Sequence, residues 1–141
     1  MSEEITELLD ALDKDTNSSV IDLTTSKIKK IKNDILQQLQ LKGPELKKLH
    51  KKLKNYRYCT DLRDLQYGFY IRWIPLKNPD KIYLTNGGLV CDVKLVKGEL
   101  HVLCKNVMNR FFQFKFDEVI IFQKISEQEQ IILGILDYLD N

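Results

Sequence analysis

The chain has 141 residues, of which 43% are hydrophobic, and a formal net charge of +2. That length suits one domain with one core, and no apolar run approaches the roughly 20 residues of a spanning helix, so the sequence predicts no membrane span. Three cysteines and two histidines without ligand spacing favour free thiols in a reducing compartment, and they predict no metal site and no cofactor.

Residues 1–19 are expected to form an acidic N-terminal helix and a linker. An apolar stripe at helical spacing predicts a short amphipathic helix over residues 3–13. The stripe consists of Ile5, Leu8, Leu9 and Leu12. Residues 1–15 hold six acids and one lysine, a charge of −5, which is unlike a secretory signal or transit peptide. We therefore expect a cytoplasmic protein that is not secreted.

Residues 20–57 are expected to form a basic arm of two helices. The first begins at Ser26 and ends at Gly43, and Pro44 opens the second. The apolar stripe of the first helix consists of Ile28, Ile31, Ile35 and Leu39. The second helix carries leucines on one face and lysines on the other. Residues 27–57 hold eleven basic and two acidic side chains, a charge of +9.

Both faces of this arm have alternative interpretations. The apolar stripe docks a protein partner or a second copy of the chain, or it folds back on the chain's own sheet, as stripes in single domains commonly do. The lysine face is a solvated surface, a phosphate-binding patch or a contact for an acidic partner. Membrane-surface attachment ranks last, because the apolar face is narrow and lacks aromatic anchors.

Residues 58–141 are expected to form a β-rich domain with a C-terminal helix, because the pattern changes to period 2 after residue 65. Residues 69–74 predict a strand with Phe69, Ile71 and Trp73 on one face. Asn86-Gly87 predicts a tight hairpin between strands at 82–84 and 89–96, because this pair readily adopts positive φ. A turn at 97–99 leads into a further strand at 100–104. These segments predict a three-stranded meander.

The last third of the chain predicts two more strands and a helix. Residues 110–116 alternate, with Phe112, Phe114 and Phe116 inward. Residues 119–122 are apolar on both faces, which predicts a central or helix-covered strand. Ser126 and Glu129 form a capping box that opens a largely buried C-terminal helix. We predict an α+β fold in which N-terminal amphipathic helices precede a small antiparallel β-barrel of the SH3-like or Sm-like kind.

Residues 53–141 resemble a group of small proteins encoded by nucleocytoplasmic large DNA viruses, the giant viruses of protists and algae. The matching segments are Tyr56-Arg57-Tyr58, residues 68–74, residues 84–88, Cys104-Lys105-Asn106, residues 121–124 and residues 136–139. The resemblance implies a setting in the host cytoplasm, at a virus factory, or in the virion. It implies no catalytic residues, because the group has no assigned mechanism.

No phosphate loop, nucleophile elbow or metal-binding helix motif is present, so the sequence predicts a protein that is not an enzyme and has no small-molecule substrate. The first hypothesis is an interaction or structural protein. In it, Ile28, Ile31, Ile35 and Leu39 contact a protein partner or a second copy of the chain.

The second hypothesis is a nucleic-acid-binding protein. Lysines of the basic helix contact phosphates, while aromatic and basic residues of the β-rich domain form a stacking platform. The residues are Lys47, Lys48, Lys51, Lys52, Lys54, Tyr70, Arg72, Lys105, Arg110 and Phe111. Against it, the β-rich domain from residue 58 holds ten basic and eleven acidic residues, a balance of −1.

Overall fold

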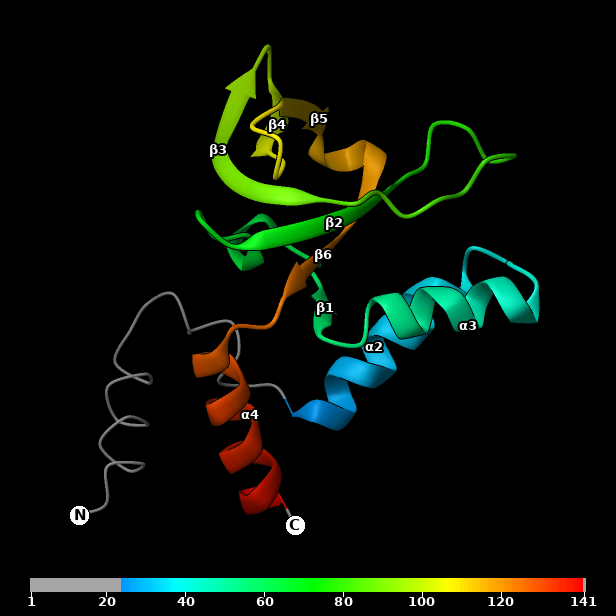
Figure 1. Cartoon of the computed structure of the whole chain (residues 1–141), viewed down its shortest axis with the longest axis vertical. Coiled ribbons are helices and arrows are strands. Elements are labelled where there is room, and N and C mark those ends of the chain that lie inside the picture. The colour runs from blue at the N-terminus through cyan, green and yellow to red at the C-terminus, as the bar shows by residue number, and fades with distance from the viewer. Residues whose placement is uncertain (1–23, 141) are drawn as a thin grey trace.

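The computed structural model describes residues 24–140, which form three α-helices and one six-stranded antiparallel sheet. The helices are α2 (Thr25–Gln37), α3 (Gly43–Lys52) and α4 (Glu127–Asp140). The strands are β1 (Tyr56–Tyr58), β2 (Tyr70–Pro75), β3 (Gly88–Val96), β4 (Glu99–Lys105), β5 (Phe111–Lys115) and β6 (Val119–Lys124). Short 3₁₀ helices lie at η2 (Leu62–Asp64) and η3 (Phe116–Glu118). Figure 1 shows the sheet above the helices.

The strand order is β1-β6-β2-β3-β4-β5, so the last strand of the chain lies between two early ones. The segment 119–122 is apolar on both faces, and a strand with neighbours on both sides can bury both. In β6, Ile120, Ile121 and Phe122 are buried. The prediction of a central or covered strand here is confirmed.

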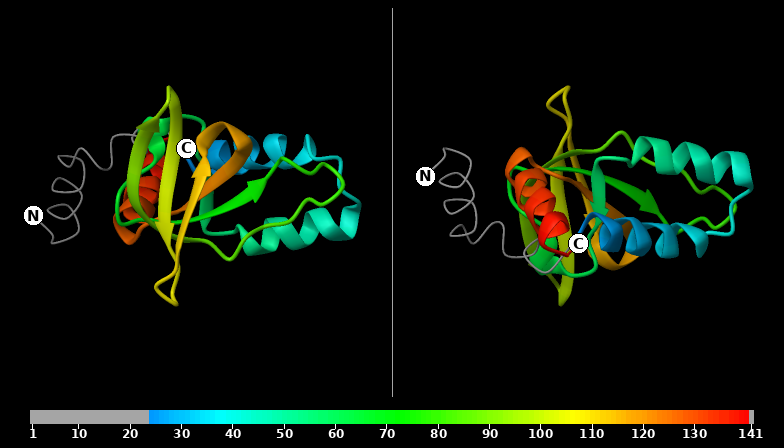
Figure 2. Two further views of the ribbon diagram at one scale, coloured as in Figure 1. Left: turned by 90° about the horizontal axis from the view of Figure 1, so that it is seen from above. Right: turned by 90° about the horizontal axis from the view of Figure 1, so that it is seen from below.

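The sheet is strongly curled, and its inner face holds the first core. Trp73 on β2 and Phe114 on β5 are three strands apart in the sheet, yet their ring centroids lie 4.5 Å apart. A register shift between Val90 and Asp92 in β3 supplies part of the bend. The buried members of this core are Cys59, Ile71, Trp73, Val90, Val102, Cys104 and Ile121. Figure 2 shows β3 and β4 from two further directions.

Helices α2 and α3 cover the outer face of one half of the sheet. Leu36, Leu49 and Leu53 pack there against Ile74, Ile120 and Phe122. Lys32 of α2 is 5% exposed, and its Nζ donates to the carbonyl oxygens of Leu53 at 2.8 Å and Tyr56 at 3.0 Å. A buried ammonium group thus satisfies the carbonyl of Leu53 at the C-terminal end of α3, where a positive charge is favourable, and that of Tyr56 at the start of β1.

Helix α4 is attached to the rest of the fold at both ends. The predicted capping box is confirmed, since Ser126 N donates to Glu129 Oε1 at 3.0 Å and Glu129 N donates to Ser126 Oγ at 3.1 Å. Glu129 also forms a fully buried ion pair with Arg57 of β1 at 3.3 Å. At the other end, Asp137 accepts hydrogen bonds from Thr25. Ile28, Ile132 and Leu133 form a small core between α2 and α4.

The prediction that N-terminal amphipathic helices precede a closed small barrel is wrong. The sheet is open, because β1 has three residues and β5 turns into η3 instead of pairing with β1. The described helices are not an N-terminal group either. Two helices precede the sheet and pack on its outer face, and the third follows the sheet. The apolar faces of the helices are buried against the sheet and against one another. The helix predicted at 3–13 lies outside the described residues.

Two local predictions also fail. Residues 82–84 form no strand, and Thr85 instead bonds directly to Trp73 of β2, so Asn86-Gly87 leads into β3 without a hairpin. The C-terminal helix is only half buried, since Tyr138 and Leu139 are 80% and 72% exposed. The β3–β4 turn is confirmed, with positive φ at Lys97 and Gly98.

Candidate nucleic-acid interface

The apolar stripe of α2 makes contacts inside the chain. Ile28 is buried against α4, and Ile35 and Leu39 pack against the core beneath α2 and α3. Ile31 is partly buried. These positions correspond to the interpretation in which the stripe serves the chain's own core.

The lysines of the basic helix are divided among different surfaces. Lys48 and Lys52 line a groove of about 570 Å³ between α3 and residues 79–84. Lys81 lies on the same groove, with its Nζ 5.6 Å from the ring centroid of Tyr83. Lys54 lines a separate pocket between α2 and α4. Lys47 and Lys51 are exposed and line neither.

Three residues of the predicted stacking platform lie in one row across the sheet. Tyr70 of β2 pairs with Leu89 of β3, Leu89 pairs with Lys105 of β4, and Lys105 pairs with Phe111 of β5. Directly opposed residues in antiparallel strands point to the same face. Their neighbours Ile71, Val90 and Cys104 are in the inner core, so Tyr70, Leu89, Lys105 and Phe111 point outward. We call these four residues the outer row.

The outer row is open to solvent, because α2 and α3 cover only the other half of this face. Leu89 is 44% and Phe111 61% exposed, and Tyr70 and Lys105 are partly exposed. An exposed phenylalanine and an exposed leucine in one cross-strand row are unusual on a solvated sheet face, which is normally polar.

The row continues towards the opposite edge of the sheet. Tyr56 of β1 pairs with Lys124 of β6, and the pairing of Ile71 with Gln123 places Lys124 next to Tyr70. Lys124 is exposed and Tyr56 partly buried. Burial raises the pKa of the Tyr56 hydroxyl, and the neighbouring Arg72 opposes that rise. Tyrosines and lysines therefore alternate across β1, β6 and β2.

Hydrogen bonds to residues 85–87, the part of the loop just before β3, fix the β2 end of the row. The Tyr70 hydroxyl donates to the carbonyl of Asn86, and Arg72 Nε donates to the carbonyl of Thr85 at 2.8 Å. Gly87 is held at a φ of +87°, and a Cβ there would lie 2.1 Å from the carbonyl oxygen of Ile71. Arg72 thus supports the loop that borders the row.

At the β5 end, Arg110 lies in an ordered turn beside Phe111. Asn106 Oδ1 accepts from the backbone N–H groups of Met108 and Arg110, both at 2.9 Å. Arg110 is exposed, as are Val107 and Met108 at the tip. The turn therefore adds a basic side chain to the end of the outer row.

The outer face of β3, β4 and β5 carries a modest positive charge. Lys94, His101 and Lys115 form a second cross-strand row. The acids at outward positions of these strands are Asp92 and Glu99, and Glu99 is paired with Lys115 at 2.8 Å. Among the described residues, Lys94 and Lys105 have no ion-pair partner, so positive charge remains available to an anionic ligand.

The described part of the chain contains no group of three His, Cys, Asp or Glu side chains that could hold a metal ion. Burial raises the pKa of the Cys59 and Cys104 thiols to about 12, which makes them poor nucleophiles. No helix within residues 24–140 is long and apolar enough to cross a membrane.

Sequence reasoning identified Tyr70, Lys105 and Phe111 but missed Leu89, Lys124 and Tyr56. The missed residues belong to strands whose neighbours are distant in sequence, so only the register reveals them.

No family model, curated protein or solved structure matches the chain. The resemblance to giant-virus proteins stays a prediction.

Proposed function

We propose that this chain is a non-enzymatic protein that binds single-stranded nucleic acid on the outer face of its sheet. The observation that carries the proposal is the outer row, in which Tyr70, Leu89, Lys105 and Phe111 are consecutive cross-strand neighbours. Proteins that bind single strands combine aromatic side chains, on which bases stack, with basic side chains that contact phosphates. The outer row provides both.

The dimensions of the outer row suit a nucleic-acid strand that runs across several β-strands. Measured along the curled sheet, Tyr70 and Phe111 are three strand spacings apart, which at about 4.8 Å each is roughly 14 Å. Lys105 lies between them, and Arg110 and Lys124 extend the positive charge at the two ends. Bases at the two aromatic side chains would therefore have intervening backbone near Lys105.

A single strand fits this surface better than a duplex. Stacking on Tyr70 or Phe111 requires a base whose face is exposed, and a duplex hides that face in its own stack. Within residues 24–140, no helix projects from the outer row towards a groove, since α2 and α3 pack on the other half of the face. We expect little sequence preference, because every base has a face that can stack.

The competing hypothesis of assembly through α2 has less support. Its contact residues pack mainly within the chain's own cores, so an interface there would have to displace α4 or the sheet. A protein partner could instead use exposed apolar side chains near the outer row, such as Val107 and Met108.

The test is fluorescence anisotropy with labelled single-stranded and duplex oligonucleotides. Phe111→Ala should weaken single-strand binding about tenfold, since base stacking on an aromatic contributes about 1–3 kcal/mol. Phe112→Ala is the matched control, because Phe112 is the next residue, is also partly exposed and points to the inner face beside Trp73. Equal effects of the two variants, or no binding by the wild type at low salt, would overturn the proposal.

A further inference from the structure

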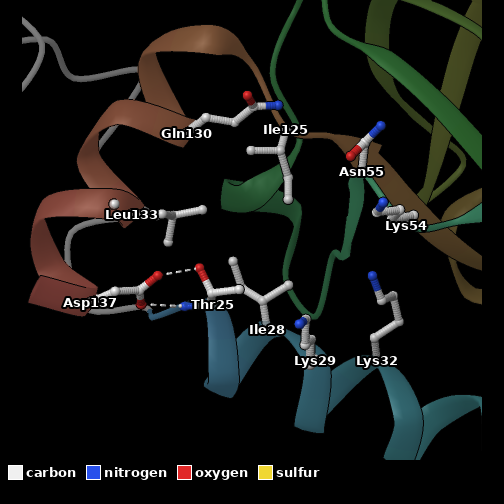
Figure 3. Close-up of a pocket in the computed structure, with 11 residues that line it drawn as sticks. Thr25, Ile28, Lys29, Lys32, Lys54, Asn55, Ile125, Gln130, Leu133 and Asp137 are labelled. Carbon is white, nitrogen blue, oxygen red and sulfur yellow. Dashed lines mark hydrogen bonds between the residues drawn. The ribbon is translucent and has the colours of Figure 1, made fainter. Parts of the chain in front are cut away.

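Helices α2 and α4 diverge from a shared contact and enclose a pocket of about 290 Å³ (Figure 3). They meet where Thr25 donates its backbone N–H and its hydroxyl to the two carboxylate oxygens of Asp137. Each helix presents one face to the pocket at spacing i, i+3, i+4 and i+7. These faces are Thr25, Ile28, Lys29 and Lys32 on α2, and Gln130, Leu133, Gly134 and Asp137 on α4.

Three lysines line the side of the pocket away from Asp137. Lys29 and Lys32 come from α2, and Lys54 lies just before β1 (Figure 3). Lys32 is held in place by its hydrogen bonds to Leu53 and Tyr56, which use two of the three N–H donors of its ammonium group. One donor of a buried cation therefore remains for a ligand.

The acid in the pocket offsets only part of this positive charge. Asp137 accepts hydrogen bonds at both carboxylate oxygens from Thr25, and these bonds, with a smaller contribution from the charge of Lys29, lower its pKa. Figure 3 shows it at the end opposite Lys54. With three lysines and one aspartate, the lining carries a charge of +2.

Gly134 keeps the pocket open. Glycine in the interior of a helix costs about 1 kcal/mol relative to alanine, so its presence here calls for a reason. A Cβ at this position would meet no atom within 4 Å, so close packing does not require glycine. A side chain at residue 134 would project from the α4 face that lines the pocket, and glycine leaves that space free.

We propose that this pocket binds a small phosphate monoester that carries an apolar group. The phosphate would lie against Lys29, Lys32 and Lys54, because phosphate is the compact anion that lysines bind as point charges. The apolar group would pack on Ile28, Ile125 and Leu133, which form the non-polar wall. The phosphate could belong to a free small molecule or to the end of a nucleic-acid strand, and both have the same monoester chemistry.

The test is a titration of the ¹⁵N-labelled protein with phenyl phosphate, followed by NMR, with phenol as the uncharged control. We expect saturable shifts of the amide signals of Asn55 and Gly134 with phenyl phosphate and none with phenol. Lys29→Gln and Lys54→Gln should each weaken binding about tenfold through loss of a charge-assisted contact. Lys30→Gln and Lys51→Gln are matched controls, because Lys30 is exposed next to Lys29 on α2, Lys51 is exposed near the end of α3, and neither lines this pocket.

Gly134→Leu tests the site without removing any charge. The leucine should fill the pocket and abolish phenyl phosphate binding, while the fold stays intact because nothing lies within 4 Å of its Cβ. Binding that survives Gly134→Leu, or that weakens equally in the control variants, would overturn the proposal, as would the absence of saturable shifts.

The source of the phosphate is tested with oligonucleotides that do or do not carry a 5′-phosphate. If the phosphate raises affinity and Gly134→Leu removes that gain, the pocket takes the end of a strand. If the phosphate makes no difference while phenyl phosphate binds, the pocket takes a free small molecule. Because the outer row does not take part in the phenyl phosphate titration, failure of either proposal leaves the other testable.

Discussion

The buried ion pair of Arg57 and Glu129 joins β1 to α4. Its side chains are 3% and 0% exposed. Glu129 also accepts the N–H of Ser126 in the capping box. Removing one partner from a buried ion pair leaves an uncompensated charge, which is far more costly than the pair itself is worth.

Glu129→Gln should therefore lower the free energy of unfolding by about 3–5 kcal/mol. Glu127→Gln is the matched control, because Glu127 is an exposed acid in the same helical turn and should change stability by less than about 0.5 kcal/mol. Urea denaturation monitored by Trp73 fluorescence measures both. Similar losses in the two variants would show that the buried pair has no special role.

The buried thiols make stability dependent on alkaline pH. Burial raises the pKa of Cys59 from 9.0 to about 12 in the folded chain, and Cys104 behaves in the same way. Because the folded pKa lies above the unfolded one, the stabilisation is complete below pH 9 and is lost as pH rises towards 12. Burial also raises the pKa of Tyr56 and Tyr58, which acts in the same direction.

Lys32 acts in the opposite direction. Burial and the neighbouring Lys29 lower its pKa below 10.5, so its charge destabilises the fold at lower pH and this cost disappears as pH approaches 10.5. One lysine is outweighed by two thiols and two tyrosines. The free energy of unfolding should therefore fall between pH 9 and pH 12, as measured by urea denaturation at fixed ionic strength.

The contribution of Cys59 is separable by substitution. In Cys59→Ala the fall with pH should be shallower by about 1.4 kcal/mol per pH unit, because one buried thiol no longer resists ionisation. Cys91→Ala is the control, since Cys91 is exposed. A wild-type stability that is constant or rising over this range would contradict the interpretation.

At the scale of elements, two glycines have opposite roles. Gly87 is required where the chain enters β3, because a Cβ would lie 2.1 Å from the carbonyl oxygen of Ile71 and its φ is +87°. Gly134 is not required by the packing of α4, because its surroundings are open.

Gly87→Ala and Gly134→Ala should therefore change stability in opposite directions. The first should lower the free energy of unfolding by more than about 1 kcal/mol, through strain at positive φ and a clash with backbone. The second should raise it by about 0.5–1 kcal/mol, through better helix propensity. Thermal denaturation followed by circular dichroism measures both, and a destabilised Gly134→Ala would show that the space beside α4 is not open.

Local signals predicted elements well where the element depends on its own sequence. The capping box at Ser126 and Glu129 and the turn at Lys97-Gly98 appear as expected. The Asn86-Gly87 signal failed because Gly87 serves a close backbone approach to β2, which has the same sequence signature as a hairpin turn. A local sequence pattern shows that a residue must adopt positive φ, but it does not show whether a hairpin turn or a close backbone contact requires it.

At the scale of the whole molecule, the sequence could not show the order of the strands. The insertion of β6 between β1 and β2 joins segments far apart in the chain, and it makes β1 and β5 the edge strands of the described sheet where a closed barrel was expected. The same long-range pairing creates the outer row. Alternation along each strand marked Tyr70, Lys105 and Phe111 separately, but only the register joins them with Leu89 and Lys124.

The outer row also explains how a chain with a small net charge could bind a polyanion. Its formal charge of +2 is too small for strong general attraction, so affinity must come from a local arrangement of stacking and charge. Because few phosphates would be neutralised, we expect a shallow dependence of affinity on salt. Under this proposal, nucleic acid binds to one face and not to the whole surface.

The most direct test of this account is the affinity of the wild type, Phe111→Ala and Phe112→Ala for one labelled single-stranded oligonucleotide, measured by fluorescence anisotropy at low salt. The account predicts that the wild type and Phe112→Ala bind with similar affinity, and that Phe111→Ala binds about tenfold more weakly. Binding that is unaffected by Phe111→Ala, or that is absent from all three proteins, would contradict it.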